Sequence, residues 1–142
     1  MKKFRILIVD DNGFFRKALM ERLQMSFPAV AINEVAGGDE ALREIDAFLP
    51  DLIFMDIKLS GENGLELTKK IKAAHPNIIV IITTSYDLVE YRDAASQFGV
   101  NRFLSKDSFN WREVEELVKS YQKVWTGKVE RNDIGKTFDS ET

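Results

Sequence analysis

Acidic side chains stand directly after two short apolar segments of this sequence. Asp10 and Asp11 follow residues 4–9, and Asp56 follows residues 52–55. Three carboxylates that lie close together repel one another and raise each other's pKa, and a divalent cation relieves this repulsion. Because the candidate ligand atoms are all oxygens, Mg²⁺ or Mn²⁺ suits such a site better than zinc. These three aspartates are therefore candidate metal ligands.

Hydroxyl groups and a lysine stand after two further apolar segments. The sequence Thr-Thr-Ser at 83–85 follows residues 78–82, and Lys106 follows residues 102–105. A hydroxyl can donate a hydrogen bond to a phosphate oxygen, and a lysine supplies a positive charge beside it. A carboxylate can itself act as the nucleophile and form an aspartyl phosphate. The combination predicts a phosphoryl-transfer site in which a carboxylate receives the group.

These apolar segments alternate with stretches whose apolar residues recur at helical spacing. Strands are expected over residues 4–9, 29–35, 52–55, 78–82 and 102–105. Helices are expected over residues 14–25, 40–48, 65–74 and 88–98. A fifth helix is expected to begin with a cap at Asp107-Ser108 and to run to about Trp125. This alternation predicts an α/β fold with an open parallel sheet covered on both faces. Ligands bind such sheets beyond the carboxyl ends of the strands. The acidic, hydroxyl and lysine side chains should therefore meet at one edge.

The composition is that of a single globular domain. The chain has 142 residues, of which 44% are hydrophobic and 30% charged, with no cysteine and one histidine. These counts exclude disulfides, thiolate or multi-histidine metal sites and thiol nucleophiles, and they argue against a Ser-His-Asp triad. The net charge of −3 argues against direct binding to nucleic acid or to an anionic membrane. Without an export signal or a membrane span, a soluble cytoplasmic protein is expected, and residues 126–142 are interpreted as a polar tail or the start of an interdomain linker.

The spacing of the polar residues resembles that of the receiver domain of bacterial two-component response regulators. The resemblance rests on the paired aspartates, on the segment DIKLSGENG that Asp56 begins, on TTS and on FLSKD. Gly64 lies eight residues after Asp56, and Thr84 lies 22 residues before Lys106, as in this family. The match covers residues 3 to about 124 and looks most like the receivers of helix-turn-helix regulators related to nitrate-response proteins.

The resemblance implies a flavodoxin-like sheet with strand order 2-1-3-4-5 over residues 1–125 and a role in phosphorelay signalling. Asp56 would accept a phosphoryl group from a sensor histidine kinase or a phosphotransfer protein. The chain would be no enzyme beyond its own phosphorylation and dephosphorylation. Mg²⁺ would be held by Asp10, Asp11, Asp56 and the backbone carbonyl of Lys58.

The same resemblance implies a conformational switch. Thr84 would donate a hydrogen bond to a phosphoryl oxygen, and Lys106 would pair with the phosphoryl group, or with a carboxylate in its absence. Phe103 would follow Thr84 inward and remodel the face formed by the fourth helix, the fifth strand and the fifth helix. A downstream output domain or protein would bind this face, whether the chain stands alone or is the receiver part of a longer transcriptional regulator.

Three positions depart from the family pattern. Ser60 replaces a frequent proline, and Lys58 and Tyr86 stand two residues after Asp56 and Thr84, respectively. The side chains of Lys58 and Tyr86 are expected to flank the phosphoryl group and to control the approach of water. They should therefore alter the lifetime of the aspartyl phosphate.

Rival functions fit these residues less well. A haloacid-dehalogenase phosphatase needs a second aspartate two residues after its nucleophile, where this chain has Lys58. A dinucleotide-binding domain needs a glycine-rich turn after the first strand, and a flavodoxin needs a Ser/Thr-rich loop there, but this chain has Asp-Asp-Asn-Gly. The remaining alternative is a protein-interaction module on the same fold that works without phosphorylation.

The expected fifth helix carries an apolar stripe. Its members recur at intervals of three and four residues: Trp111, Val114, Val118, Tyr121 and Trp125. Such a stripe suits either the sheet-facing core of one chain or a heptad-like seam between two chains. A core role and a homodimer therefore both remain open.

Overall fold

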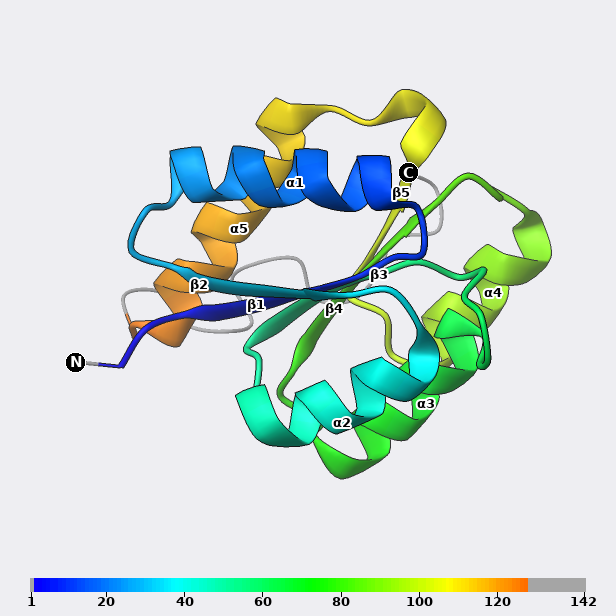
Figure 1. Ribbon diagram of the computed structural model, residues 1–142. Coiled ribbons are helices and arrows are strands. Elements are labelled where there is room, and N and C mark those ends of the chain that lie inside the picture. The colour runs from blue at the N-terminus through cyan, green and yellow to red at the C-terminus, as the bar shows by residue number, and fades with distance from the viewer. Residues whose placement is uncertain (1, 128–142) are drawn as a thin grey trace.

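A computed structural model of the chain describes residues 2–127, with a five-stranded parallel sheet at its centre (Figure 1). The strands are β1 (Arg5–Val9), β2 (Ala31–Val35), β3 (Leu52–Met55), β4 (Ile79–Thr84) and β5 (Arg102–Ser105). They lie in the order β2-β1-β3-β4-β5, and every neighbouring pair is parallel. The predicted doubly wound α/β fold and its strand order are confirmed.

Helices cover both faces of this sheet. They are α1 (Gly13–Ser26), α2 (Gly38–Phe48), α3 (Gly64–Ala74), α4 (Val89–Gln97) and α5 (Trp111–Trp125). Figure 1 shows α1 and α5 on one face and α2, α3 and α4 on the other. Successive residues of a strand point to opposite faces. Leu7 and Val9 therefore belong to the core under α2, α3 and α4, whereas Ile6 and Ile8 belong to the core under α1 and α5.

The central strands are unbroken buried runs because both faces of the sheet are covered. All four residues of β3 and all six of β4 are buried. Burial of a large aliphatic side chain stabilises a fold by roughly 1.5–3 kcal/mol, so these strands form a firm base for the polar residues at their ends. β4 continues to Thr84, two residues beyond its predicted end, because Thr83 and Thr84 pair with Leu104 and Ser105 of β5. Both threonines are thereby buried.

The start of α5 differs from the prediction. Asn110 caps the helix, since its Oδ1 accepts hydrogen bonds from the N–H groups of Arg112 and Glu113, at 2.9 and 3.3 Å. The predicted cap at Asp107-Ser108 is wrong, because these two residues belong to a short 3-10 turn, η1 (Lys106–Ser108).

Aromatic packing accounts for the later start of α5. The ring of Phe109 makes edge-to-face contacts with Phe15 on α1 and with Trp111, with ring centroids 5.2 and 5.1 Å apart. Anchoring Phe109 in this way keeps its backbone extended, at φ −65° and ψ 130°, which is not a helical conformation. The helix therefore begins only at Trp111.

The apolar stripe of α5 faces the sheet. Val114, Val118 and Tyr121 are buried in the core that α1 shares. Trp125 is 36% exposed and packs edge-on against Phe4, with ring centroids 5.4 Å apart. The core role of this stripe is confirmed, and the homodimer stays a prediction.

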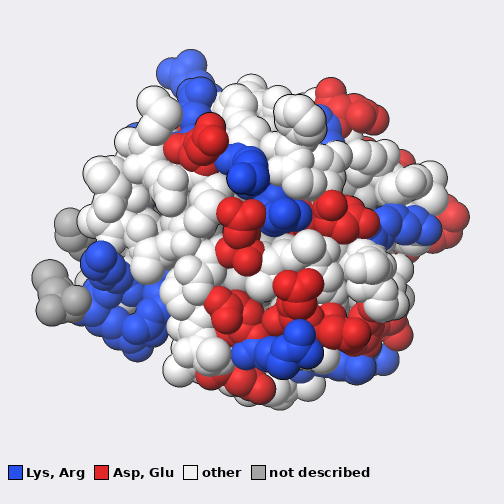
Figure 2. Space-filling model, viewed as in Figure 1, with Lys and Arg blue, Asp and Glu red and all other residues white. Residues whose placement is uncertain are grey.

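The surface carries charges of both signs. Figure 2 shows acidic and basic side chains interspersed over most of the face seen in Figure 1. No helix within residues 2–127 is both long and apolar enough to cross a membrane. The predicted polar tail, residues 126–142, lies almost entirely outside the described residues.

Candidate functional site

The carboxyl ends of β1 and β3 bring Asp10, Asp11 and Asp56 together. One carboxylate oxygen from each lies within 4.8 Å of the others. Strands β1 and β3 are parallel neighbours that pair Val9 with Met55, so the residues that follow them meet at one edge. Asp10 and Asp56 are buried, at 1% and 5% exposure, whereas Asp11 is exposed. The three aspartates thus meet at the edge where the sequence placed them.

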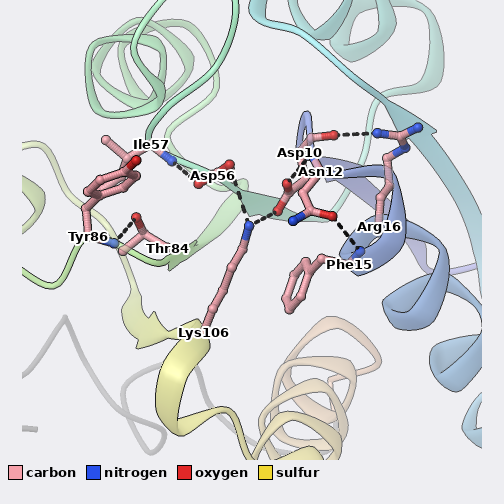
Figure 3. A network of polar contacts seen from close by, with 9 residues as sticks. All are labelled: Asp10, Asn12, Phe15, Arg16, Asp56, Ile57, Thr84, Tyr86 and Lys106. Carbon is pink, nitrogen blue, oxygen red and sulfur yellow. Dashed lines mark hydrogen bonds and ion pairs between the residues drawn. The ribbon is translucent and has the colours of Figure 1, made fainter.

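Lys106 reaches this cluster from the end of β5 (Figure 3). Its Nζ lies 2.8 Å from Asp10 Oδ2 and 3.6 Å from Asp56 Oδ2, and its side chain is only 11% exposed. The ammonium also lies 4.5 Å from the ring centroid of Phe15, where the π-system attracts it. Its approach to Asp10 makes an ion pair and no hydrogen bond, so the buried Asp10 Oδ2 lacks a hydrogen-bond partner.

Burial dominates the electrostatics of Asp56. Burial first, and then the negative charge of Asp10, raise the pKa of Asp56 from 3.8 to about 7, and Asp11 acts in the same direction. Lys106 lowers this pKa, as does the N–H of Ile57, which donates to Asp56 Oδ1 at 2.8 Å.

This donor set fits a hard divalent cation. One lysine faces three carboxylates, so the edge carries excess negative charge, and the buried oxygen of Asp10 lacks a hydrogen bond. A cation bound by oxygen ligands would relieve both conditions. The acidic pocket formed by Asp10, Asp11 and Asp56 is therefore suited to Mg²⁺ and ill suited to zinc.

A tight loop after β3 holds Asp56 at the sheet edge. The N–H of Gly64 donates to the carbonyl of Ile57 at 2.8 Å, which folds residues 57–64 back beside the acidic pocket. A Cβ atom at Gly64 would overlap the backbone carbonyl of Asp56, so the close approach of the two backbones requires glycine. This contact gives a physical reason for the glycine eight residues after Asp56.

Lys58 lies beside two tyrosines. Its Nζ is 5.2 Å from the ring centroid of Tyr86 and 5.6 Å from that of Tyr91 on α4. A hydrogen bond with the Tyr91 side chain raises the pKa of Lys58 above its usual value. Lys58 and Tyr86 are thus neighbours in the structure, and Tyr91 is a third member of this group that the sequence spacing did not reveal.

Thr84 and Phe103 are both buried, and each has a specific neighbour. Thr84 Oγ1 accepts a hydrogen bond from the N–H of Tyr86 at 3.0 Å (Figure 3). Phe103 is 4% exposed, and the guanidinium of Arg92 lies 4.7 Å from its ring centroid. Arg92 in turn donates to both carboxylate oxygens of Asp87, at 2.6 and 3.2 Å. Sequence reasoning missed Arg92, because no local pattern places it over Phe103.

The turn that carries Asp10 and Asp11 is held by four further contacts. Asp10 Oδ1 accepts from the N–H of Asn12 at 2.9 Å, and Asn12 Oδ1 caps α1. Arg16 donates through Nη1 to the backbone carbonyl of Asp10 and through Nε to Glu34 Oε1, both at 2.6 Å. Sequence reasoning missed Arg16 and Glu34, because they are 18 residues apart on different elements.

A flavodoxin-like sheet with an acidic pocket and a lysine at its carboxyl edge defines a receiver domain. Residues 6–119 match the response regulator receiver domain, and the chain belongs to this family. The resemblance seen in the sequence is confirmed. Receiver domains are signalling modules of two-component systems, which pair with histidine kinases and output domains.

Known relatives agree with this assignment. Sensory transduction protein LytT of Bacillus subtilis is 32% identical over 120 residues, which are 84% of this chain and 48% of LytT. A CheY-like response regulator receiver domain protein from Methanospirillum hungatei superposes with a TM-score of 0.81 at 26% identity, over 90% of this chain and 100% of that one. A two-component response regulator of the LuxR family from an Aurantimonas species gives a TM-score of 0.73 at 26% identity, over 98% and 91% of the two chains. The chain spans about half the length of LytT.

Proposed function

We propose that this receiver domain accepts a phosphoryl group on Asp56 from a histidine kinase or a phosphotransfer protein. An oxygen of Asp56 forms the bond to phosphorus while the bond from phosphorus to the donor's imidazole nitrogen breaks. The observation that carries the proposal is the burial of Asp56 between an acidic pair and Lys106, whose Nζ lies 3.6 Å from it. Lys106 would pair with phosphoryl oxygens, and its position facing this carboxylate supports that role.

Mg²⁺ completes the proposed site. The carboxylates of Asp10, Asp11 and Asp56 and the backbone carbonyl of Lys58 would hold it, in keeping with the oxygen-rich pocket. A bound Mg²⁺ would offset negative charge on the transferring group. The chain's own contribution is to keep the carboxylates close together and to support Asp56 with Lys106 and the Ile57 N–H.

Phosphorylation would then shift the domain between two arrangements. The phosphoryl group adds about −1.5 to −2 charges and strong hydrogen-bond acceptors. The hydroxyl of Thr84 now accepts from Tyr86, so its own O–H can donate to a phosphoryl oxygen. Movement of Thr84 would alter the packing around Phe103 and so change the face formed by α4, β5 and α5. An output domain or a partner protein would bind this face.

A receiver that acts without phosphorylation is the alternative function. Such a module would not need a buried carboxylate whose pKa is raised, because that arrangement opposes stability. The intact acidic pocket with its lysine therefore favours the phosphorylated receiver.

Intact-mass spectrometry tests the proposal. The protein would be incubated with Mg²⁺ and acetyl phosphate, beside Asp56→Asn and the control Asp46→Asn, whose carboxylate is 83% exposed on α2. One phosphoryl mass should appear in the wild type and in the control, but not in Asp56→Asn or with EDTA. Beryllofluoride binding, followed by NMR, provides a second readout. Absence of both phosphorylation and beryllofluoride binding in the wild type would favour the phosphorylation-independent module.

A further inference from the structure

The Arg16 side chain joins the turn of the acidic pocket to the neighbouring strand β2. It extends from α1, and its guanidinium is largely enclosed, with 17% of the side chain exposed. One edge of the guanidinium donates to the backbone carbonyl of Asp10, and another donates to Glu34 on β2 (Figure 3 shows the contact with Asp10). At 2.6 Å, both contacts are slightly shorter than is usual for charge-assisted N–H···O hydrogen bonds.

The contact with Asp10 acts on the peptide group that leads to Asp11. The carbonyl of Asp10 and the N–H of Asp11 share one planar unit. The hydrogen bond from Arg16 to that carbonyl therefore fixes the orientation of this peptide plane, and with it the direction in which the Asp11 side chain leaves the backbone. Asp10 has further constraints of its own, from the Asn12 N–H and Lys106. Within residues 2–127, the carboxylate of Asp11 has no hydrogen bond or ion pair, so its backbone decides where it points.

Glu34 gives the guanidinium a fixed orientation. A planar guanidinium that is bound at two edges cannot rotate freely, unlike a lysine ammonium. Glu34 lies on β2, whose residue Val35 accepts a hydrogen bond from the N–H of Asp10 at 3.2 Å. The pair Arg16–Glu34 thus ties the turn to the sheet at a second point.

We propose that Arg16 is a positioning residue for the metal site, which holds the Asp10–Asp11 peptide so that both carboxylates face a divalent cation. The inference rests on the proposed function, because it assumes that Mg²⁺ binds in the acidic pocket. Glu34 acts through Arg16 and has no direct role toward the metal.

The direction in which the Mg²⁺ affinity changes when Arg16 is replaced distinguishes positioning from an effect of its charge. If Arg16 acted only through its charge, its removal would make the pocket more negative and would strengthen Mg²⁺ binding. If it only tied α1 to β2, its removal would lower stability and leave the Mg²⁺ affinity unchanged. Positioning predicts a weaker affinity, by about tenfold or more, as for other groups that orient metal ligands.

A Mg²⁺ titration followed through backbone amide NMR shifts tests the proposal on the full chain. The variants are Arg16→Ala, Arg16→Lys, Glu34→Gln and the control Arg43→Ala, an exposed arginine on α2. Arg16→Ala should raise the dissociation constant for Mg²⁺ about tenfold, Arg16→Lys should recover part of the loss, and Arg43→Ala should match the wild type. Phosphorylation by acetyl phosphate should return toward the wild-type rate at saturating Mg²⁺.

A double-mutant cycle tests the role of Glu34. Glu34→Gln should weaken Mg²⁺ binding less than Arg16→Ala does, and adding it to Arg16→Ala should cause no further loss. If Arg16→Ala does not fold, Arg16→Lys and Glu34→Gln still report on the Mg²⁺ affinity. An unchanged or stronger affinity in the folded variants would overturn the inference about Arg16 only. Failure of the wild type to bind Mg²⁺ would overturn the proposed function as well.

Discussion

Replacing Asp56 with asparagine is expected to stabilise the metal-free domain at neutral and alkaline pH. The substitution keeps the size of the side chain and a carbonyl oxygen that can still accept from the Ile57 N–H. It removes a buried negative charge that lies beside Asp10 and Asp11. Lys106 loses an interaction at 3.6 Å but keeps its closer ion pair with Asp10 at 2.8 Å.

The magnitude follows from the pKa of Asp56. Burial and the neighbouring carboxylates raise this pKa from 3.8 to about 7. The difference corresponds to about 4 kcal/mol in the free energy of unfolding, at 1.36 kcal/mol for each pH unit. Because asparagine also gives up the attraction to Lys106 and must itself be buried, the expected gain is about 2–4 kcal/mol.

The direction of the Asp56 pKa shift determines how the stability of the domain depends on pH. The native state holds the Asp56 proton more tightly than the unfolded state, so the stability of the wild type falls as the pH rises from about 4 to about 7. The difference between Asp56→Asn and the wild type should therefore be small near pH 4 and complete above about pH 7.

Urea unfolding in EDTA, followed by tryptophan fluorescence at several pH values, measures this difference. The exposed carboxylate of Asp46 provides the control, since Asp46→Asn should shift stability little at any pH. A variant Asp56→Asn that is less stable than the wild type near pH 8, or a stability difference that does not change with pH, would refute the reasoning.

The remaining predictions concern the loop, the phosphoryl lifetime and the α5 cap. Gly64→Ala should destabilise the domain by about 3 kcal/mol or more, because the Cβ atom of alanine would overlap the Asp56 carbonyl. Thermal unfolding measures the change in the free energy of unfolding, and a loss below about 1 kcal/mol would contradict the close fit. Replacing Lys58 and Tyr86 together by Asn and Glu should speed hydrolysis of the aspartyl phosphate about tenfold, because two bulky side chains that pack together would no longer shield it from water. The decay of the phosphorylated mass with time measures the hydrolysis rate. An unchanged lifetime of the aspartyl phosphate would disprove this role. Asn110→Ala should lower the free energy of unfolding in urea by about 1 kcal/mol, since Asn110 accepts two hydrogen bonds at the start of α5. A variant as stable as the wild type would argue against this cap.

A matched control accompanies the glycine substitution. A Cβ atom at Gly13, the first residue of α1, would meet the Arg16 side chain at 3.8 Å, which is an ordinary van der Waals contact. Alanine favours helix over glycine by roughly 1 kcal/mol, so this variant should match or exceed the stability of the wild type.

Much of the fold follows from the sequence because its patterns are local. Apolar runs such as residues 52–55 and 78–82 can be recognised as strands, and helical spacing identifies the segments between them. Parallel strands present their carboxyl ends at one edge, so the alternation of strands and helices already predicts that Asp10, Asp56 and Lys106 meet there. The strand order itself was implied by the resemblance to receiver domains.

Tertiary packing decided features that no local pattern contains. The cap of α5 lies at Asn110 because Phe109 packs between two aromatic rings that come from different elements. The guanidinium of Arg92 lies over Phe103 because α4 packs beside β5, although the two residues are 11 positions apart in the sequence. In each case the outcome depends on which distant side chains meet.

The acidic pocket also combines features that the sequence predicts with features that only the tertiary structure decides. Residue types and spacing determined which groups reach the edge of the sheet: carboxylates, a lysine and a hydroxyl. The tertiary structure determined how deeply each is buried and which partners orient it, and hence the raised pKa of Asp56 and the hold of Arg16 on the Asp10 carbonyl. The physical reason is that periodicity acts over a few residues, whereas burial and electrostatic interaction energies depend on every group packed around the site.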